Sequence, residues 1–148
     1  MFGWFKSKKQ KAYEMGRDVG ARITGELEEY VKLRVLPAAE RFVAVFEGQL
    51  KTIHNDPEHD PRLVTKVEWD IFLENLDKFA GEMKAELSVM SYKWDEVLDA
   101  LGSRDAIDEF ISERINVIVE DMKEKAATMA LAAIGETDGA EAAAGTTG

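Results

Sequence analysis

The densest group of side chains that could perform chemistry lies in the segment HNDPEHDP, residues 54–61. It contains both histidines of the chain and three carboxylates: His54, Asp56, Glu58, His59 and Asp60. Imidazole nitrogens and carboxylate oxygens at this density could bind a divalent metal ion. Counted from Asp56, however, the sixth and twelfth positions are proline and valine, whereas an EF-hand loop needs glycine and glutamate there. We therefore predict a rigid polar turn and keep a metal site as an alternative.

Other catalytic and metal chemistries are excluded by residue type. The absence of cysteine rules out disulfides, thiolate zinc sites, iron–sulfur clusters and a cysteine nucleophile. The chain has no Glu-x-x-His pair of the di-iron bundle type, no phosphate-binding loop and no dinucleotide fingerprint. We predict a protein that is not an enzyme, with no catalytic residue and no cofactor.

The first eleven residues, MFGWFKSKKQK, form a basic aromatic head. Three aromatic residues are followed by four lysines. The candidate contact residues are Phe2, Trp4, Phe5, Lys6, Lys8, Lys9 and Lys11. Aromatic rings favour the membrane interface, and lysines bind anionic headgroups. The head is therefore a candidate for contact with an anionic membrane surface. Docking on a protein, and a terminus without a role, remain open.

The charge of the chain separates this head from the rest. The net charge is −10 over 148 residues, of which the head carries +4 and the remainder −14. Such an acidic chain is not expected to bind nucleic acid, because the phosphate backbone repels it. The sequence lacks the run of about 20 apolar residues that crosses a bilayer. The lysines follow the apolar residues of the head, which is unlike a signal peptide, so we expect a cytoplasmic protein whose head can lie on the inner face of a membrane.

The apolar pattern predicts an all-α fold. Apolar residues recur at three- and four-residue steps, as on one face of a helix, and no useful stretch alternates with a period of two. We expect helical segments over residues 9–53, 61–101 and 103–134. Links this short make neighbouring helices antiparallel, so the prediction is an elongated antiparallel bundle of three long helical segments. The domains are then the head (1–11), the bundle (12–134) and a disordered C-terminal tail (135–148).

Proline, glycine and capping residues indicate where these helices begin, bend and end. Pro37 is expected to kink or break the first segment, giving three or four helices. Asp60 before Pro61 is typical of a helix start, Gly102 of a helix end, and Ser103 is the expected cap of the last helix. The second segment makes the molecule elongated, or it bends, and the expected place for a bend is near the serines at 88 and 91.

Two sets of residues are candidates for helix interfaces. The second segment carries a heptad-like seam that we expect to lie in the core or between copies: Trp69, Phe72, Leu76, Phe79, Met83, Leu87, Met90 and Trp94. Three helices need not cover this seam, so a homo-oligomer is predicted. Gly16 and Gly20 share one helix face with other small residues. This face can mark a fraying helix, close packing within the chain or self-association, and these three explanations stay open.

Together these features favour a non-enzymatic helical interaction or scaffold protein with itself or another protein as partner, attached to a membrane through its head. A soluble oligomeric structural subunit whose head docks into a neighbouring protein is one alternative. A helical metal-binding protein that uses the histidine-rich link is the other.

Overall fold

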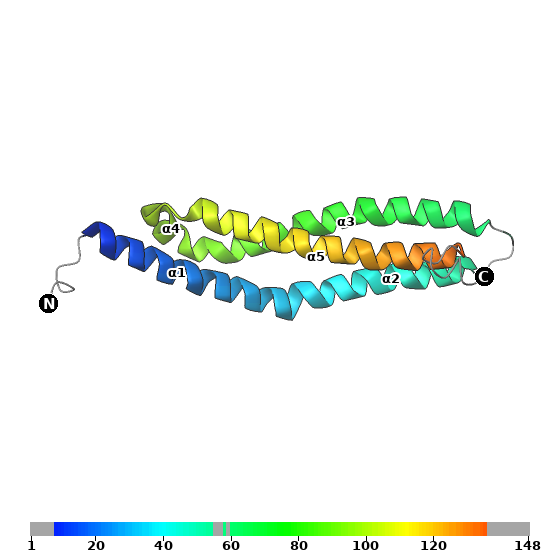
Figure 1. The fold of residues 1–148 in the computed structure, drawn as a ribbon, viewed down its shortest axis with the longest axis horizontal. Coiled ribbons are helices and arrows are strands. Elements are labelled where there is room, and N and C mark those ends of the chain that lie inside the picture. The colour runs from blue at the N-terminus through cyan, green and yellow to red at the C-terminus, as the bar shows by residue number, and fades with distance from the viewer. Residues whose placement is uncertain (1–7, 55–57, 59, 136–148) are drawn as a thin grey trace, which may run out of the picture.

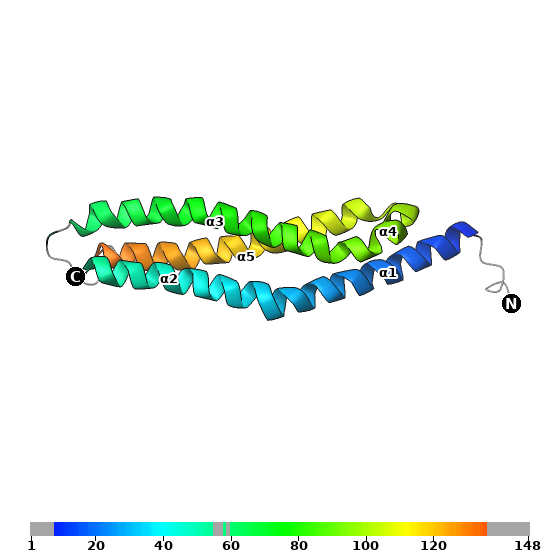
Figure 2. The same cartoon turned by 180° about the vertical axis from the view of Figure 1, so that it is seen from behind.

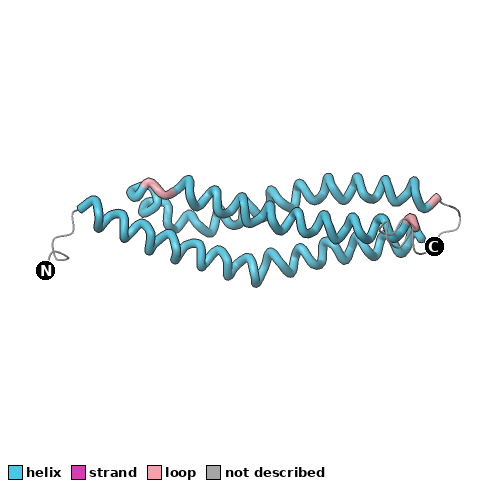
Figure 3. Tube along the Cα trace, viewed as in Figure 1, coloured by secondary structure: helices cyan, strands magenta, loops and turns pink. Residues whose placement is uncertain are grey.

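The computed structural model describes residues 8–54, 58 and 60–135, of which about 95% are helical, with no strand among these residues. The predicted all-α fold is confirmed. Three long rods lie side by side (Figure 1, Figure 3). The first consists of α1 (Lys8–Tyr30), a π-helical turn (Val31–Val35) and α2 (Leu36–His54); the second of α3 (Pro61–Ser91), a 3₁₀ turn (Tyr92–Trp94) and α4 (Asp95–Leu101); and the third is α5 (Arg104–Ala133).

The three rods form an elongated bundle rather than a sphere. α5 packs against both α2 and α3, and α2 also packs against α3. At the other end of the molecule α1 packs against α3, α4 and α5. Figures 1 and 2 show that the start of α1 extends beyond the turn that joins α4 to α5. The N-terminal end of the first rod therefore protrudes from the bundle.

The ends of the second rod are built from the residues that the sequence marks. The Asp60 carboxylate accepts a hydrogen bond from the backbone N–H of Arg62 at 3.0 Å, with Pro61 in the first turn. Gly102 takes the left-handed conformation at φ +66°, which a side chain would disfavour. Both predictions are confirmed.

Ser103 does not cap α5 as predicted. Its hydroxyl donates to the Leu101 carbonyl at 3.4 Å and makes no hydrogen bond to the N–H groups of α5. The reason lies in the turn, because the backbone N–H of Ser103 donates to the Leu98 carbonyl at 2.9 Å and closes the end of α4. Its ψ of 5° then differs from the extended backbone of a capping residue.

Pro37 kinks the first rod and does not break it. Proline has no N–H, and its ring clashes with the carbonyl four residues earlier in a regular helix. Here the preceding turn is π-helical, with the N–H of Leu36 donating to the Val31 carbonyl five residues earlier. Helical structure continues on both sides, and Figure 1 shows the bend between α1 and α2. The bundle therefore has three rods, not four.

The π-helical turn also keeps one apolar stripe on the inside. The stripe on this rod repeats every four residues: Val19, Ile23, Leu27, Val31, Val35, Ala39 and Val43. In a regular α-helix such a stripe would rotate by about 40° at each step. A π-helical turn has more residues per turn and reverses part of that rotation. Val31 and Val35 are consequently both fully buried.

The second rod bends close to the predicted position. The Ser91 hydroxyl donates to the Ser88 carbonyl at 2.7 Å, and the N–H of Tyr92 donates instead to Val89, three residues earlier. A serine that bonds back to the helix in this way loosens the regular pattern. Arg104 of α5 donates to the same buried hydroxyl at 3.0 Å and joins the bend to the third rod.

The α3 seam faces the interior of the bundle. Four of its members are buried in the core: Phe72, Leu76, Phe79 and Leu87. The other four are partly buried against that core: Trp69, Met83, Met90 and Trp94. Rings from α2 and α3 form a cluster with centroids 4.6–6.2 Å apart. The other rods of the same chain therefore cover most of the seam, so it no longer supports the predicted self-association.

Candidate functional site

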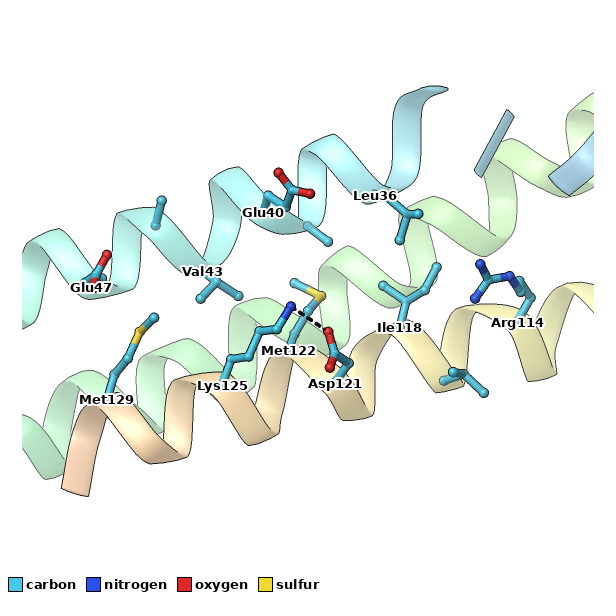
Figure 4. Close-up of a pocket in the computed structure, with 13 residues that line it drawn as sticks. Leu36, Glu40, Val43, Glu47, Arg114, Ile118, Asp121, Met122, Lys125 and Met129 are labelled. Carbon is cyan, nitrogen blue, oxygen red and sulfur yellow. Dashed lines mark ion pairs between the residues drawn. The ribbon is translucent and has the colours of Figure 1, made fainter. Parts of the chain in front are cut away.

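A groove with a volume of about 470 Å³ lies between α2 and α5 (Figure 4). Its apolar lining includes Leu36, Val43, Ile118, Met122 and Met129. The groove lies open along the side of these two packed helices. Such a trough offers apolar contact area rather than an enclosed reaction chamber.

Charged side chains border this groove. Glu40 and Glu47 of α2 and Asp121 and Lys125 of α5 lie along it. The Lys125 ammonium lies 2.9 Å from an Asp121 oxygen, and this hydrogen bond raises the pKa of Lys125 above its ordinary value. Arg114 also lines the groove, so three carboxylates stand against two cations and the border is weakly acidic.

A forked ion pair joins α1 to α5 at one end of the groove. Arg114 Nε lies 2.9 Å from Glu28 Oε1, and Arg114 Nη2 lies 3.0 Å from Glu28 Oε2. This bidentate geometry is the strongest arrangement available to the two groups. The hydrogen bonds from Arg114 hold the pKa of Glu28 below its ordinary value. The pair is structural, because each charge is satisfied by the other.

A second polar junction lies close to this ion pair along the first rod, between α1 and the bend of the second rod. Lys93 Nζ lies 2.8 Å from a Glu26 oxygen, which lowers the pKa of Glu26. The cationic groups of Arg22 and Lys93 each lie 5.7 Å from the centre of the Trp94 ring. Nearby, the Tyr30 hydroxyl donates to Glu86, which raises the pKa of Tyr30. Trp94 is thus covered by cations of its own chain.

A smaller trough lies between α3 and α5. Its volume is about 320 Å³, and its lining includes Trp69, Ala127, Leu131 and Ile134. Arg62 and Lys66 border it, and Lys66 Nζ lies 2.7 Å from an Asp70 oxygen. This trough is apolar with a basic border, in contrast to the acidic groove.

The third surface, here called the α2–α3 face, has depressions that are almost uncharged. Five of its residues line these depressions: Val45, Gln49, Thr52, Val64 and Ile71. Leu63 and Val67 complete the face, because they precede Ile71 at four-residue steps on α3. Two shallow depressions lie between these helices, with volumes of about 180 and 470 Å³. Of the described residues that line them, only Glu68 is charged.

Sequence reasoning did not single out this face. Leu63, Val67 and Ile71 follow one another at four-residue steps, which places them on one side of α3. That signal was available, but the first half of α3 also carries the longer seam. With apolar residues on two sides of one helix, periodicity does not tell which side turns inward.

The structure describes only some of the predicted head residues. Phe2, Trp4, Phe5 and Lys6 lie outside the described residues. Lys8, Lys9 and Lys11 are in the first turns of α1, which contain no acidic residue, and their side chains are not described. The structure therefore places the lysine-rich helix start at the protruding end of the first rod (Figure 2).

The small-residue face of α1 makes no close helix contact at Gly20. A Cβ atom added there would meet no described atom within 4 Å outside the helix itself. Close packing on another helix of the chain, one of the three predicted explanations, is therefore wrong at Gly20. Gly16 lies in the same helix, and the other two explanations remain predictions.

The metal alternative falls largely outside the described residues. Asp56 and His59 are not described, nor is the side chain of His54, whereas Asp60 caps α3. Within residues 8–54, 58 and 60–135, no group of three or more His, Cys, Asp or Glu side chains could hold a metal ion. Metal binding by the histidine-rich link stays a prediction. The expected tail over 135–148 likewise lies outside the description after Gly135.

Comparison of the chain with known protein families, curated proteins and solved structures finds no match. Among the described helices, none combines the length and the apolar character needed to cross a lipid bilayer.

Proposed function

We propose that the protein is a non-enzymatic helical interaction protein, which attaches to an anionic membrane surface through its N-terminal head and presents the sides of its rods to protein partners. The observation that carries this proposal is the position of the lysine-rich start of α1 at the protruding end of the molecule (Figure 1). At that end the head can touch a surface without displacing any packed helix.

Electrostatics favours contact at this end. The unpaired N–H groups at the start of a helix carry a partial positive charge, and the lysines add to it. Each lysine close to an anionic cytoplasmic leaflet contributes about 1 kcal/mol of attraction. The remaining chain carries −14 and is repelled by the same surface. The rod therefore meets the membrane with its N-terminal end, and its sides stay in water.

The sides of the rods support an interaction role. The three hollows between the rods are open and mainly apolar, and they differ in charge at their borders: acidic, basic and nearly uncharged. Apolar stripes of this kind on a helix surface suit partner proteins better than small substrates.

Co-sedimentation of the full chain with vesicles tests the membrane attachment. We expect binding to vesicles that contain phosphatidylserine, no binding to pure phosphatidylcholine, and release as salt screens the lysines over about 8 Å. Trp4→Ala/Phe5→Ala should weaken binding, because the rings no longer enter the interface, and should leave the helical circular dichroism signal unchanged.

Two charge-matched double variants distinguish the effect of the head lysines on vesicle binding from the effect of the protein's net charge. Lys8→Gln/Lys9→Gln and Lys51→Gln/Lys78→Gln change the net charge equally, and the second pair lies on exposed sides of α2 and α3. We expect only the first pair to lose vesicle binding. No binding of the wild-type protein to anionic vesicles at low salt would refute the attachment.

A further inference from the structure

The α2–α3 face carries four large apolar side chains that are exposed to solvent. Leu63 is 65% exposed, Val45 61%, Val67 48% and Ile71 44%. These are four of the ten large apolar side chains that stand exposed among the described residues. Val45 and Ile71 line one depression, and Leu63 and Val67 precede Ile71 at four-residue steps on the same helix.

We propose that the α2–α3 face binds the same face of a second copy of this chain. The occupant follows from charge. A basic partner would be selected by carboxylates and an acidic partner by lysines, and the depressions of this face offer neither, apart from Glu68. Among the exposed charges beside it on α3, Lys66 is paired with Asp70 and Lys78 with Glu74. An uncharged apolar face is best matched by another one, and the chain itself supplies it.

Self-association must also overcome the repulsion between two copies that each carry −10. Copies that met through the α2–α5 groove would bring Glu40, Glu47 and Asp121 of one chain close to the same carboxylates of the other. Contact through the α2–α3 face buries valine, leucine and isoleucine side chains, and Glu68 is the one carboxylate among the described residues that line its depressions. It is therefore the contact that costs least electrostatically.

The oligomeric state of the full chain tests this pairing by sedimentation velocity over a range of concentrations. We expect reversible dimers whose population rises between about 50 mM and about 500 mM salt, because salt screens the repulsion and does not weaken apolar burial. Attachment to vesicles has the opposite salt dependence, so failure of one proposal is distinguishable from failure of the other.

Two substitutions of equal exposure locate the interface. Val45 and Val117 are both 61% exposed, but Val117 lies beside the α2–α5 groove. Val45→Glu should raise the dimer dissociation constant by roughly tenfold or more, since a buried unpaired carboxylate costs more than 1.4 kcal/mol. Val117→Glu adds the same charge and should raise it by less than about twofold. Val67→Glu serves as a second interface variant if Val45→Glu lowers the helical signal.

A monomer at every concentration and salt would overturn the proposal. Equal effects of Val45→Glu and Val117→Glu on the dimer dissociation constant would also overturn it. They would show that added negative charge weakens association regardless of where it lies on the surface. Loss of the dimer in Trp4→Ala/Phe5→Ala would assign the contact to the head instead. Dimers that persist in both interface variants would place the contact elsewhere on the chain.

Discussion

Single residues join rods that are far apart in the sequence. Glu28 and Arg114 are 86 positions apart, yet their three hydrogen bonds hold α1 and α5 in one register. Ser91 and Arg104 act similarly at the bend of the second rod, where one hydroxyl both donates to its own helix and accepts from the next. These contacts set how the rods are aligned lengthwise, which apolar packing alone leaves loosely defined.

Glu28→Gln should lower stability in a pH-dependent way. Arg114 stabilises the ionised carboxylate, so the pKa of Glu28 is lower in the folded than in the unfolded protein. The stabilisation is present above the unfolded pKa of about 4.3 and is lost as pH falls through the folded value. Urea unfolding at pH 7 should show a loss of about 1–2 kcal/mol in the variant.

The difference between wild type and Glu28→Gln should shrink as the pH falls below about 4. Glu74→Gln is the control, because the pair of Glu74 with Lys78 is exposed and 4.0 Å long. It should change the free energy of unfolding by less than about 0.5 kcal/mol. A constant difference between Glu28→Gln and wild type across the acid range would contradict the ion-pair account.

At this scale the sequence predicts local features and misses long-range ones. Asp60 and Gly102 are predictable because a cap depends on neighbouring backbone. Ser103 has the right residue type for a cap, but the same backbone is used by the turn that ends α4. The pairing of Glu28 with Arg114 cannot be read from the chain, since it depends on how two rods are aligned.

The π-helical turn is the feature of the first rod that departs most from regular geometry. Its extra residue compensates the four-residue repeat of the stripe around it. The repeat is visible in the sequence and could have indicated an irregular turn. Pro37 indicated only that a disturbance lies nearby, which is why the sequence left a kink and a break open and did not predict the form of the kink.

Deletion of the exposed Lys32, combined with Pro37→Ala, should be tolerated. The deletion removes the extra residue, and the turn can close as a regular α-helix once the proline ring is gone. We expect cooperative thermal unfolding and wild-type helicity by circular dichroism.

Deletion of Glu124, an exposed residue in the regular helix α5, is the matched comparison. It rotates every later side chain by about 100° and should abolish cooperative unfolding. If the two deletions were equally harmful, the π-helical turn would not be the compensating element described above.

The orientation of α3 shows what element-level reasoning cannot decide. Its seam and its outer stripe of Leu63, Val67 and Ile71 are both apolar. The seam turns inward because it carries the large rings that meet Phe42 and Phe46 of α2. The sequence therefore predicts the helix and its length, whereas the exposed face becomes visible only once the rods are packed.

The whole molecule is expected to be long in solution. The first rod has 47 residues from Lys8 to His54, which corresponds to about 70 Å. Small-angle X-ray scattering of a dilute sample should give a maximum dimension of at least about 70 Å, whereas a compact sphere with a radius of gyration near 15 Å has a diameter of only about 40 Å. Measurement of Val45→Glu in parallel separates the shape of one copy from that of an associated pair. A symmetric pair-distance distribution would contradict the extended bundle.

The length of the first rod has a mechanical consequence. From Lys8, at the protruding end, to Val45, on the α2–α3 face, the helix rises by about 55 Å. Electrostatic influence in physiological salt decays over about 8 Å. The electrostatic potential of a membrane bound at the N-terminal end therefore does not reach the α2–α3 face. The free energies of binding at the two sites should add independently. The rod works as a spacer, whose reach is changed by inserting or removing whole helical turns.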